Sequence, residues 1–129
     1  MIDELKGNKL VAFIPGKPVA QNLRVTRTGK VFRPKEYRVW VNDIRTVAKL
    51  ECKHEPINGA VRLTAVFFIR SKNKGLKVTR PDVDNYMKAA MDALEGIFYH
   101  NDSQVTTLHA EKRFSNTTEG VVLEAEEIE

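Results

Sequence analysis

Hydrophobic and polar residues recur along this chain with spacings that predict two amphipathic helices. Residues 36–52 place apolar side chains at steps of three and four, and residues 83–95 repeat that spacing, with Gly96 positioned to end the second helix. The apolar stripes contain Tyr37, Trp40, Val41, Ile44, Val47 and Ala48 in the first helix and Val83, Tyr86, Met87, Ala90 and Leu94 in the second. Each helix is therefore expected to pack one face against a core.

The remaining chain carries strand patterns. Residues 60–70 are dense in β-branched and aromatic side chains, which predicts a strand near the centre of a sheet. Residues 9–14 predict a shorter strand that stops at Pro15-Gly16, and residues 22–32 predict a basic hairpin around residues 28–30.

Two further alternating segments, residues 105–114 and 120–126, are expected to pair with each other as an antiparallel hairpin around residues 115–118. No repeat or linker divides the sequence. The elements together predict one α+β domain over residues 1–129, with a mixed β-sheet and about two helices packed on it.

Composition narrows the class of protein. The chain has 129 residues, of which 42% are hydrophobic and 29% charged, and this balance is typical of a globular protein rather than a disordered one. The longest apolar run, residues 65–69, is too short to cross a membrane. Cys52 is alone, and the start of the chain lacks the apolar run of a secretory signal. We therefore expect a cytoplasmic protein without a membrane partner.

Basic residues are concentrated in blocks. Residues 5–35 contain eight Lys or Arg and no acidic residue, and residues 56–81 contain six and again none. The acidic residues gather instead near the C-terminus. Blocks of positive charge favour a polyanion such as nucleic acid, although a solvated basic face without a ligand gives the same pattern. The residues expected to contact DNA are Lys17, Arg24, Arg27, Lys30, Arg33, Lys72, Lys74, Lys77 and Arg80.

Carboxylates are placed beside the most basic of these blocks. Asp82 and Asp84 lie where the second helix begins, Lys88 follows one turn later, and Asp102 comes after the helix. Carboxylates surrounded by positive charge suit a Mg²⁺ ion that acts on a phosphodiester. Each residue also has a structural explanation: Asp82 as a helix cap, Asp84 and Lys88 as an i,i+4 ion pair, and Asp102 as part of a turn.

The segment from Arg80 to Leu94, followed by Gly96 and by Asp102-Ser103-Gln104, resembles the signature of the RusA-type Holliday-junction resolvases. The opening Ile14-Pro15-Gly16-Lys17-Pro18-Val19 is similar to that family as well, so the resemblance covers most of the chain. Two positions depart from it. Asn101 stands where many relatives have a second acidic residue, and Ala20-Gln21-Asn22 replaces a frequent Lys-Gly-Arg-Pro run.

The resemblance implies a RusA-like fold and a crossover junction endodeoxyribonuclease, bacterial or encoded by a prophage, that acts as a homodimer on four-way DNA junctions. It implies Mg²⁺ as cofactor, with Mn²⁺ substituting, and no small-molecule cofactor. Asp82, Asp84 and Asp102 match the catalytic, metal-binding aspartates, and Lys88 matches a functional lysine. The three aspartates are therefore expected to converge. The alternative is a catalytically silent protein that binds branched DNA, such as a phage accessory factor.

Overall fold

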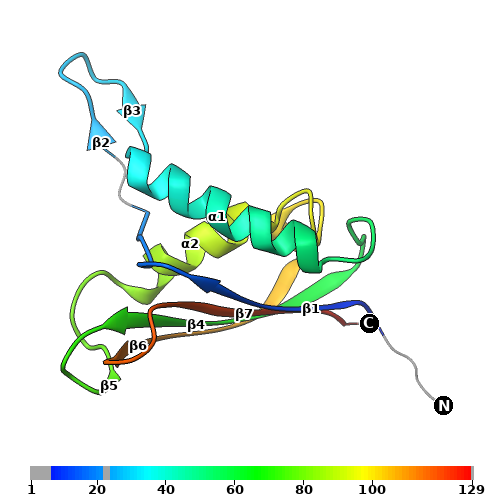
Figure 1. Ribbon diagram of the computed structural model, residues 1–129. Helices are drawn as coiled ribbons and strands as arrows, with labels where there is room; N and C mark the ends of the chain where they lie inside the picture. The colour runs from blue at the N-terminus through cyan, green and yellow to red at the C-terminus, as the bar shows by residue number, and fades with distance from the viewer. Residues whose placement is uncertain (1–6, 22–23, 129) are drawn as a thin grey trace.

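The computed structural model describes residues 7–21 and 24–128. A five-stranded sheet carries two helices on one face, and a two-stranded hairpin projects from one end of the molecule (Figure 1). The elements are β1 (Lys9–Pro15), β2 (Arg24–Val25), β3 (Val31–Phe32), α1 (Lys35–Glu51), β4 (Ala60–Arg70), β5 (Gly75–Leu76), α2 (Val83–Leu94), the 3-10 turn η1 (Asp102–Gln104), β6 (Val105–Ser115) and β7 (Gly120–Ile128). The predicted α+β class is confirmed.

The strand order of the large sheet is β1-β7-β4-β6-β5. β4 pairs with β6 in parallel and with β7 antiparallel, so β6 and β7 are not neighbours. The prediction that residues 105–114 and 120–126 form a hairpin is therefore wrong. β4 separates them because its inward side chains are fully buried, and a central position in a sheet satisfies its backbone groups on both edges.

The core lies between this sheet and the two helices. Inward residues of β1, β4 and β7 alternate with outward ones, as the pleat of a strand requires. The helical stripes meet them much as the sequence predicts, with Tyr37, Trp40, Ile44 and Ala48 buried on α1 and Tyr86, Met87, Ala90 and Leu94 on α2. Gly96 follows α2 with a φ of 81°, a conformation that glycine adopts without a Cβ penalty.

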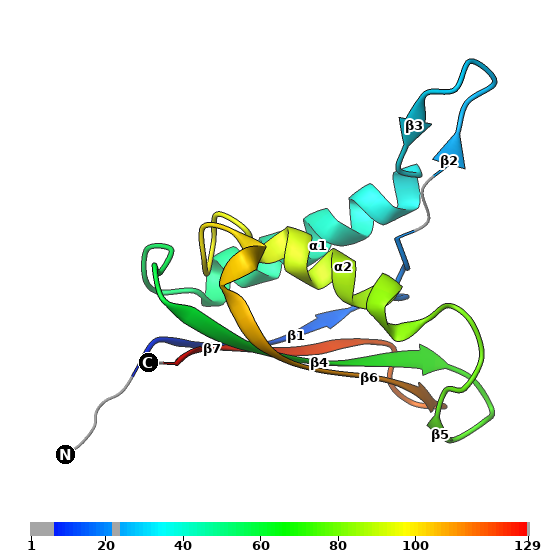
Figure 2. The ribbon, with the colours of Figure 1, turned by 180° about the vertical axis from the view of Figure 1, so that it is seen from behind.

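α2 lies in the connection between the parallel strands β4 and β6 (Figure 2). Its beginning lies beside the far half of β6, because the Lys112 ammonium reaches the carbonyl of Pro81. Its end lies near the start of β6, where the Asp102 backbone N–H donates to the Glu95 carboxylate. The helix therefore runs antiparallel to β4 and β6, and its two ends lie near opposite ends of these strands.

No helix of the described residues lies on the opposite face of the sheet. Apolar side chains there remain partly exposed, as for Val11 at 55% and Phe13 at 45%. Acidic residues of β7 lie on this face in ion pairs, Glu124 with Lys9 at 3.0 Å and Glu126 with Arg62 at 3.1 Å. These glutamates of the C-terminal strand thus lie across the sheet from α1 and α2, and Glu129 is outside the described residues.

Candidate active site

Two exposed carboxylates mark the beginning of α2. Asp82 occupies the N-cap position with extended backbone angles, but its side chain makes no capping hydrogen bond. Asp84 follows in the first turn. Within residues 7–21 and 24–128, neither carboxylate is part of an ion pair. The explanation of Asp82 as a helix cap is weakened because its capping bond is not formed. The explanation of Asp84 as the partner of Lys88 is weakened in the same way, because that ion pair is not formed.

Two ammonium groups hold the loop that leads to Asp82. Lys112 Nζ donates to the carbonyl oxygens of Thr79 at 2.6 Å and Pro81 at 2.5 Å. Lys77 Nζ donates to the Thr79 hydroxyl at 2.8 Å and also contacts the Arg80 carbonyl. These bonds fix the backbone of residues 79–81, just before the N-cap. They therefore fix the position of the Asp82 Cα, from which the carboxylate extends.

Lys77 itself is therefore not part of an exposed basic surface, which corrects the prediction that it contacts DNA. Its side chain is buried, with 8% of the residue exposed, and its donors are taken by the loop. Burial, with the nearby Lys112 ammonium as the smaller cause, lowers the pKa of Lys77 below its usual value.

Sequence reasoning also missed Lys112, which holds the loop before Asp82. Its position between Ala110 and Phe114 in an alternating strand places it on the helix side of the sheet.

Asp102 lies at the other end of α2. The helix has 12 residues and therefore spans about 18 Å. Asp102 is tied to its C-terminal end by the 2.9 Å bond from its backbone N–H to Glu95, whereas Asp82 is at the N-terminal end. In the described part of one chain, no three His, Cys, Asp or Glu side chains are grouped to hold a metal. The expected convergence of Asp82, Asp84 and Asp102 within one chain is thus wrong.

Side-chain hydrogen bonds of the neighbouring residues hold the turn around Asp102 in place. Asn101 accepts from the Ser103 N–H at 2.8 Å, and the Gln104 amide donates to the carbonyls of Ile57 and Gly59 at 2.9 Å each. Asn101, Ser103 and Gln104 therefore have structural roles. Asp102, Glu95 and Asp92 all lie near Tyr99, and they add to burial in raising the pKa of its hydroxyl.

Lys88 is exposed on α2, one turn after Asp84. Among the described residues it forms no ion pair with Asp84 or with Asp92. The Asp92 carboxylate instead accepts a 2.9 Å hydrogen bond from the Tyr37 hydroxyl of α1. The Lys88 ammonium is therefore available to an anion from outside the protein.

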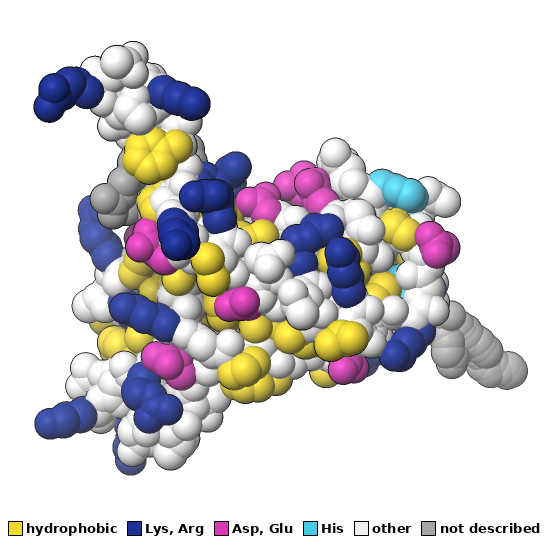
Figure 3. Space-filling model, turned by 45° about the horizontal axis from the view of Figure 1, so that its top comes forward, with side chains coloured by type: hydrophobic (Ala, Val, Ile, Leu, Met, Phe, Trp, Pro, Cys, Tyr) yellow, Lys and Arg dark blue, Asp and Glu magenta, His cyan; other side chains and the backbone are white. Residues whose placement is uncertain are grey.

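Two projections at the same end of the molecule, the β2–β3 hairpin and the loops on either side of β5, carry exposed basic residues (Figures 1 and 3). The hairpin region supplies Arg27, Lys30 and Arg33, and the β5 loops supply Lys72, Lys74 and Arg80. Lys17 is exposed between them. The backbone of Arg24 belongs to β2, but its side chain lies outside the described residues.

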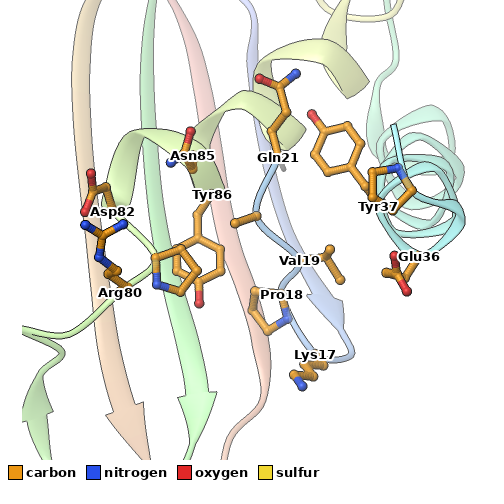
Figure 4. A pocket seen from close by; sticks show the side chains of 13 residues that line it. Lys17, Pro18, Val19, Gln21, Glu36, Tyr37, Arg80, Asp82, Asn85 and Tyr86 are labelled. Atoms are coloured by element: carbon orange, nitrogen blue, oxygen red, sulfur yellow. The ribbon is translucent and has the colours of Figure 1, made fainter. Parts of the chain in front are cut away.

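A pocket of about 700 Å³ opens between these projections (Figure 4). It is formed by the segment after β1, the start of α1 and the start of α2. Its lining residues are Lys17, Pro18, Val19, Ala20, Gln21, Pro34, Glu36, Tyr37, Arg80, Pro81, Asp82, Asn85 and Tyr86. The Gln21 N–H donates to the Asn85 carbonyl at 2.9 Å, which attaches the first segment to α2. Asp82 thus lies on the wall of a cavity flanked by positive charge.

Comparison with known proteins adds to this geometry. Over 44 residues the chain is 50% identical to the uncharacterized protein YqaN of Bacillus subtilis (strain 168), and this match covers 33% of the chain and 31% of YqaN. No described helix is long and apolar enough to cross a membrane. The model of the family "Endodeoxyribonuclease RusA" matches residues 15–126, which include the pocket, both basic projections and the whole of α2. With the aspartates at the start of α2 and a match over most of its length, the chain belongs to the RusA endodeoxyribonuclease family.

Proposed function

We propose that this chain is a metal-dependent endodeoxyribonuclease that resolves four-way DNA junctions by paired, symmetric nicks in recombination and repair. The observation that carries the proposal is the pair of exposed carboxylates, Asp82 and Asp84, between two basic projections. A protein that only binds DNA gains nothing from negative charge there, because carboxylates repel phosphate unless a cation lies between them. A cytoplasmic, bacterial or prophage setting stays a prediction.

Asp82 and Asp84 would hold the Mg²⁺ ion, with Mn²⁺ able to substitute. Their oxygens suit it, because Mg²⁺ keeps several waters and commonly takes only one or two protein carboxylates. When bound, the ion would activate a water and neutralise charge on the phosphate. The protein's own residues position the reacting groups. Lys77 and Lys112 hold the loop that leads to Asp82. Lys88 presents an ammonium group beside Asp84 that can bind a phosphate oxygen.

We further propose that the enzyme is a homodimer. Two nicks on opposing strands require two sites, and one chain carries one pair of carboxylates at the start of α2. In the same chain Asp102 lies toward the other end of α2, a helix about 18 Å long. A second subunit would supply Asp102 instead: a two-fold axis that sets two α2 helices antiparallel would bring each Asp102 to the partner's Asp82 and Asp84, at both sites.

The proposal is tested with a synthetic four-way junction and a linear duplex, each incubated with and without Mg²⁺. We expect nicks at symmetric positions in the junction only when Mg²⁺ is present, and an intact duplex. The catalytically silent branched-DNA-binding protein, favoured by the separation of Asp102 from Asp82 in one chain, predicts binding without cleavage in either Mg²⁺ or Mn²⁺. That result would overturn the assignment of an enzyme.

A further inference from the structure

We propose that the pocket between the segment at residues 17–21 and the starts of α1 and α2 takes a single unstacked nucleobase from the bound DNA strand. This inference rests on the proposed action on DNA junctions and specifies which part of the substrate the protein reads. The pocket volume of about 700 Å³ lies within the range of roughly 300–1,000 Å³ that is usual for sites of small ligands.

The chemistry of the walls suits a flat heteroaromatic ring. Apolar surfaces come from Pro18, Val19 and Pro81 and from the ring of Tyr86, which is stacked on Phe67 at 5.5 Å between centroids and so cannot easily move. Two amide side chains also line the cavity. That of Gln21 lies beside the Arg33 guanidinium and the Tyr37 hydroxyl, and that of Asn85 can form the paired hydrogen bonds that amides make with base edges. Flipped bases are held in this way, between apolar surfaces with polar groups at the edge.

The charge balance of the pocket argues for a base rather than a phosphate. Two carboxylates, Asp82 and Glu36, line it together with two cations, Lys17 and Arg80 (Figure 4). The lining is therefore close to neutral, whereas the projections on either side are basic. Phosphates are expected to follow the projections, and the neutral part of a nucleotide is expected to enter the cavity.

The position of the pocket links it to cleavage. Asp82 belongs both to its wall and to the proposed metal site. A base seated there would fix the neighbouring phosphate relative to the Asp82 carboxylate, which is the positional contribution that raises the rate of a bound reaction. At a branch point a base has already lost a stacking neighbour, so unstacking costs least where a junction is to be cut.

The test uses junctions that carry the fluorescent base 2-aminopurine at the branch point or in the middle of one arm, in EDTA so that no strand is cut. Binding is followed separately by the anisotropy of a dye on another arm. We expect the wild-type protein to raise 2-aminopurine fluorescence several-fold at the branch point and to leave it unchanged in the arm. A bound junction whose branch-point base stays quenched would overturn the pocket proposal, and absence of junction binding would overturn the proposed function with it.

A variant that fills the cavity gives the second readout. Ala20 lines the pocket and is partly buried, so Ala20→Trp adds an indole there without removing a packed side chain. We expect it to bind the junction but to lose the fluorescence rise, and to cleave about 10²-fold more slowly in Mg²⁺ because the scissile phosphate is misplaced. Ala20→Leu, a smaller filler with an unchanged unfolding midpoint, should give an intermediate loss. Val11→Trp on the open face of the sheet is the control and should behave as wild type. A full fluorescence rise with Ala20→Trp would contradict the assignment.

Discussion

The Asp82 side chain stands at a helix N-terminus without serving as its cap. An aspartate in that position usually accepts a hydrogen bond from the first turn, which stabilises a protein by about 1 kcal/mol. Here the bond is not made, and the loop before Asp82 is fixed instead by the ammonium groups of Lys77 and Lys112. The carboxylate is thus held in position by its backbone while its oxygens remain available to a ligand.

Lys88 gives a prediction at this scale. Since its ammonium forms no ion pair among the described residues, Lys88→Ala should change the free energy of unfolding by less than ~0.5 kcal/mol. Its proposed role near the phosphate predicts that single-turnover cleavage falls about 10²-fold while junction affinity changes little. Lys49→Ala, on the exposed side of α1, is the matched control. Unchanged cleavage by Lys88→Ala would leave the residue as an ordinary surface lysine.

Lys112 gives a second prediction. Lys112→Met keeps most of the side-chain volume but removes the bonds to the Thr79 and Pro81 carbonyls. Charged hydrogen bonds of this kind contribute about 1.5–3 kcal/mol, so denaturant unfolding should show a loss in that range. Cleavage should fall as well, because the backbone before Asp82 is no longer fixed. Lys49→Met should leave both properties intact, and equal behaviour of the two variants would argue against a role for Lys112.

Single residues also show what a sequence can and cannot reveal about the site. Asp82, Asp84 and Lys88 are recognisable because they share one short segment beside a basic loop. The place of Lys77 in that loop predicts contact with DNA, but its burial depends on how the loop folds back over β6. The separation of Asp102 from Asp82 likewise follows from the direction of α2, which local spacing does not specify.

At the scale of elements, local pattern predicts the helices and most strands, and the pairing of strands is where it fails. The boundaries of β4 and α2 follow directly from hydrophobic periodicity. The position of β4 between β6 and β7 depends on contacts between residues far apart in sequence, and adjacency along the chain points to the wrong partner. The two-residue strand β5 is too short to give any periodic signal.

The two helices are joined by a hydrogen bond that yields a prediction of its own. The Tyr37 hydroxyl of α1 donates to the Asp92 carboxylate of α2 at 2.9 Å, and burial, with Asp92 as the smaller cause, raises the pKa of the tyrosine. Tyr37→Phe should lower the free energy of unfolding by about 1.5–3 kcal/mol, as for other bonds to a charged group. Tyr86→Phe is the comparison, since the Tyr86 hydroxyl makes no side-chain hydrogen bond among the described residues. A loss of equal size in both variants would contradict this role for the Tyr37–Asp92 bond.

At the scale of the whole molecule, one end of the protein collects the features expected of a DNA-cleaving surface. The β2–β3 hairpin and the β5 loops project there with their basic side chains (Figure 3). The pocket, with Asp82 in its wall, lies between them. The glutamates of β7 are paired on the opposite face of the sheet. A polyanion is thus attracted to one side of the protein, and the affinity for DNA should fall steeply with salt.

The proposed dimer gives a prediction that separates shared sites from sites built within one chain. Asp82→Asn and Asp102→Asn proteins should each be inactive. If the partner supplies Asp102, a mixed dimer has one site with both substitutions and one site with neither, so mixing the variants should restore nicking of one strand. Sites built within one chain would each carry one substitution, and the mixture would stay inactive. Light scattering on the same samples establishes whether dimers are present at all.

The central claim is that Asp82 serves chemistry rather than folding or DNA affinity, and one measurement tests it directly. Wild-type and Asp82→Asn proteins are incubated with a labelled four-way junction in Mg²⁺, and bound and nicked DNA are quantified in the same samples. The account predicts that Asp82→Asn binds the junction at least as tightly as wild type, because a repulsive charge is removed, and that it produces no nicks. Wild-type rates of nicking by Asp82→Asn would contradict it.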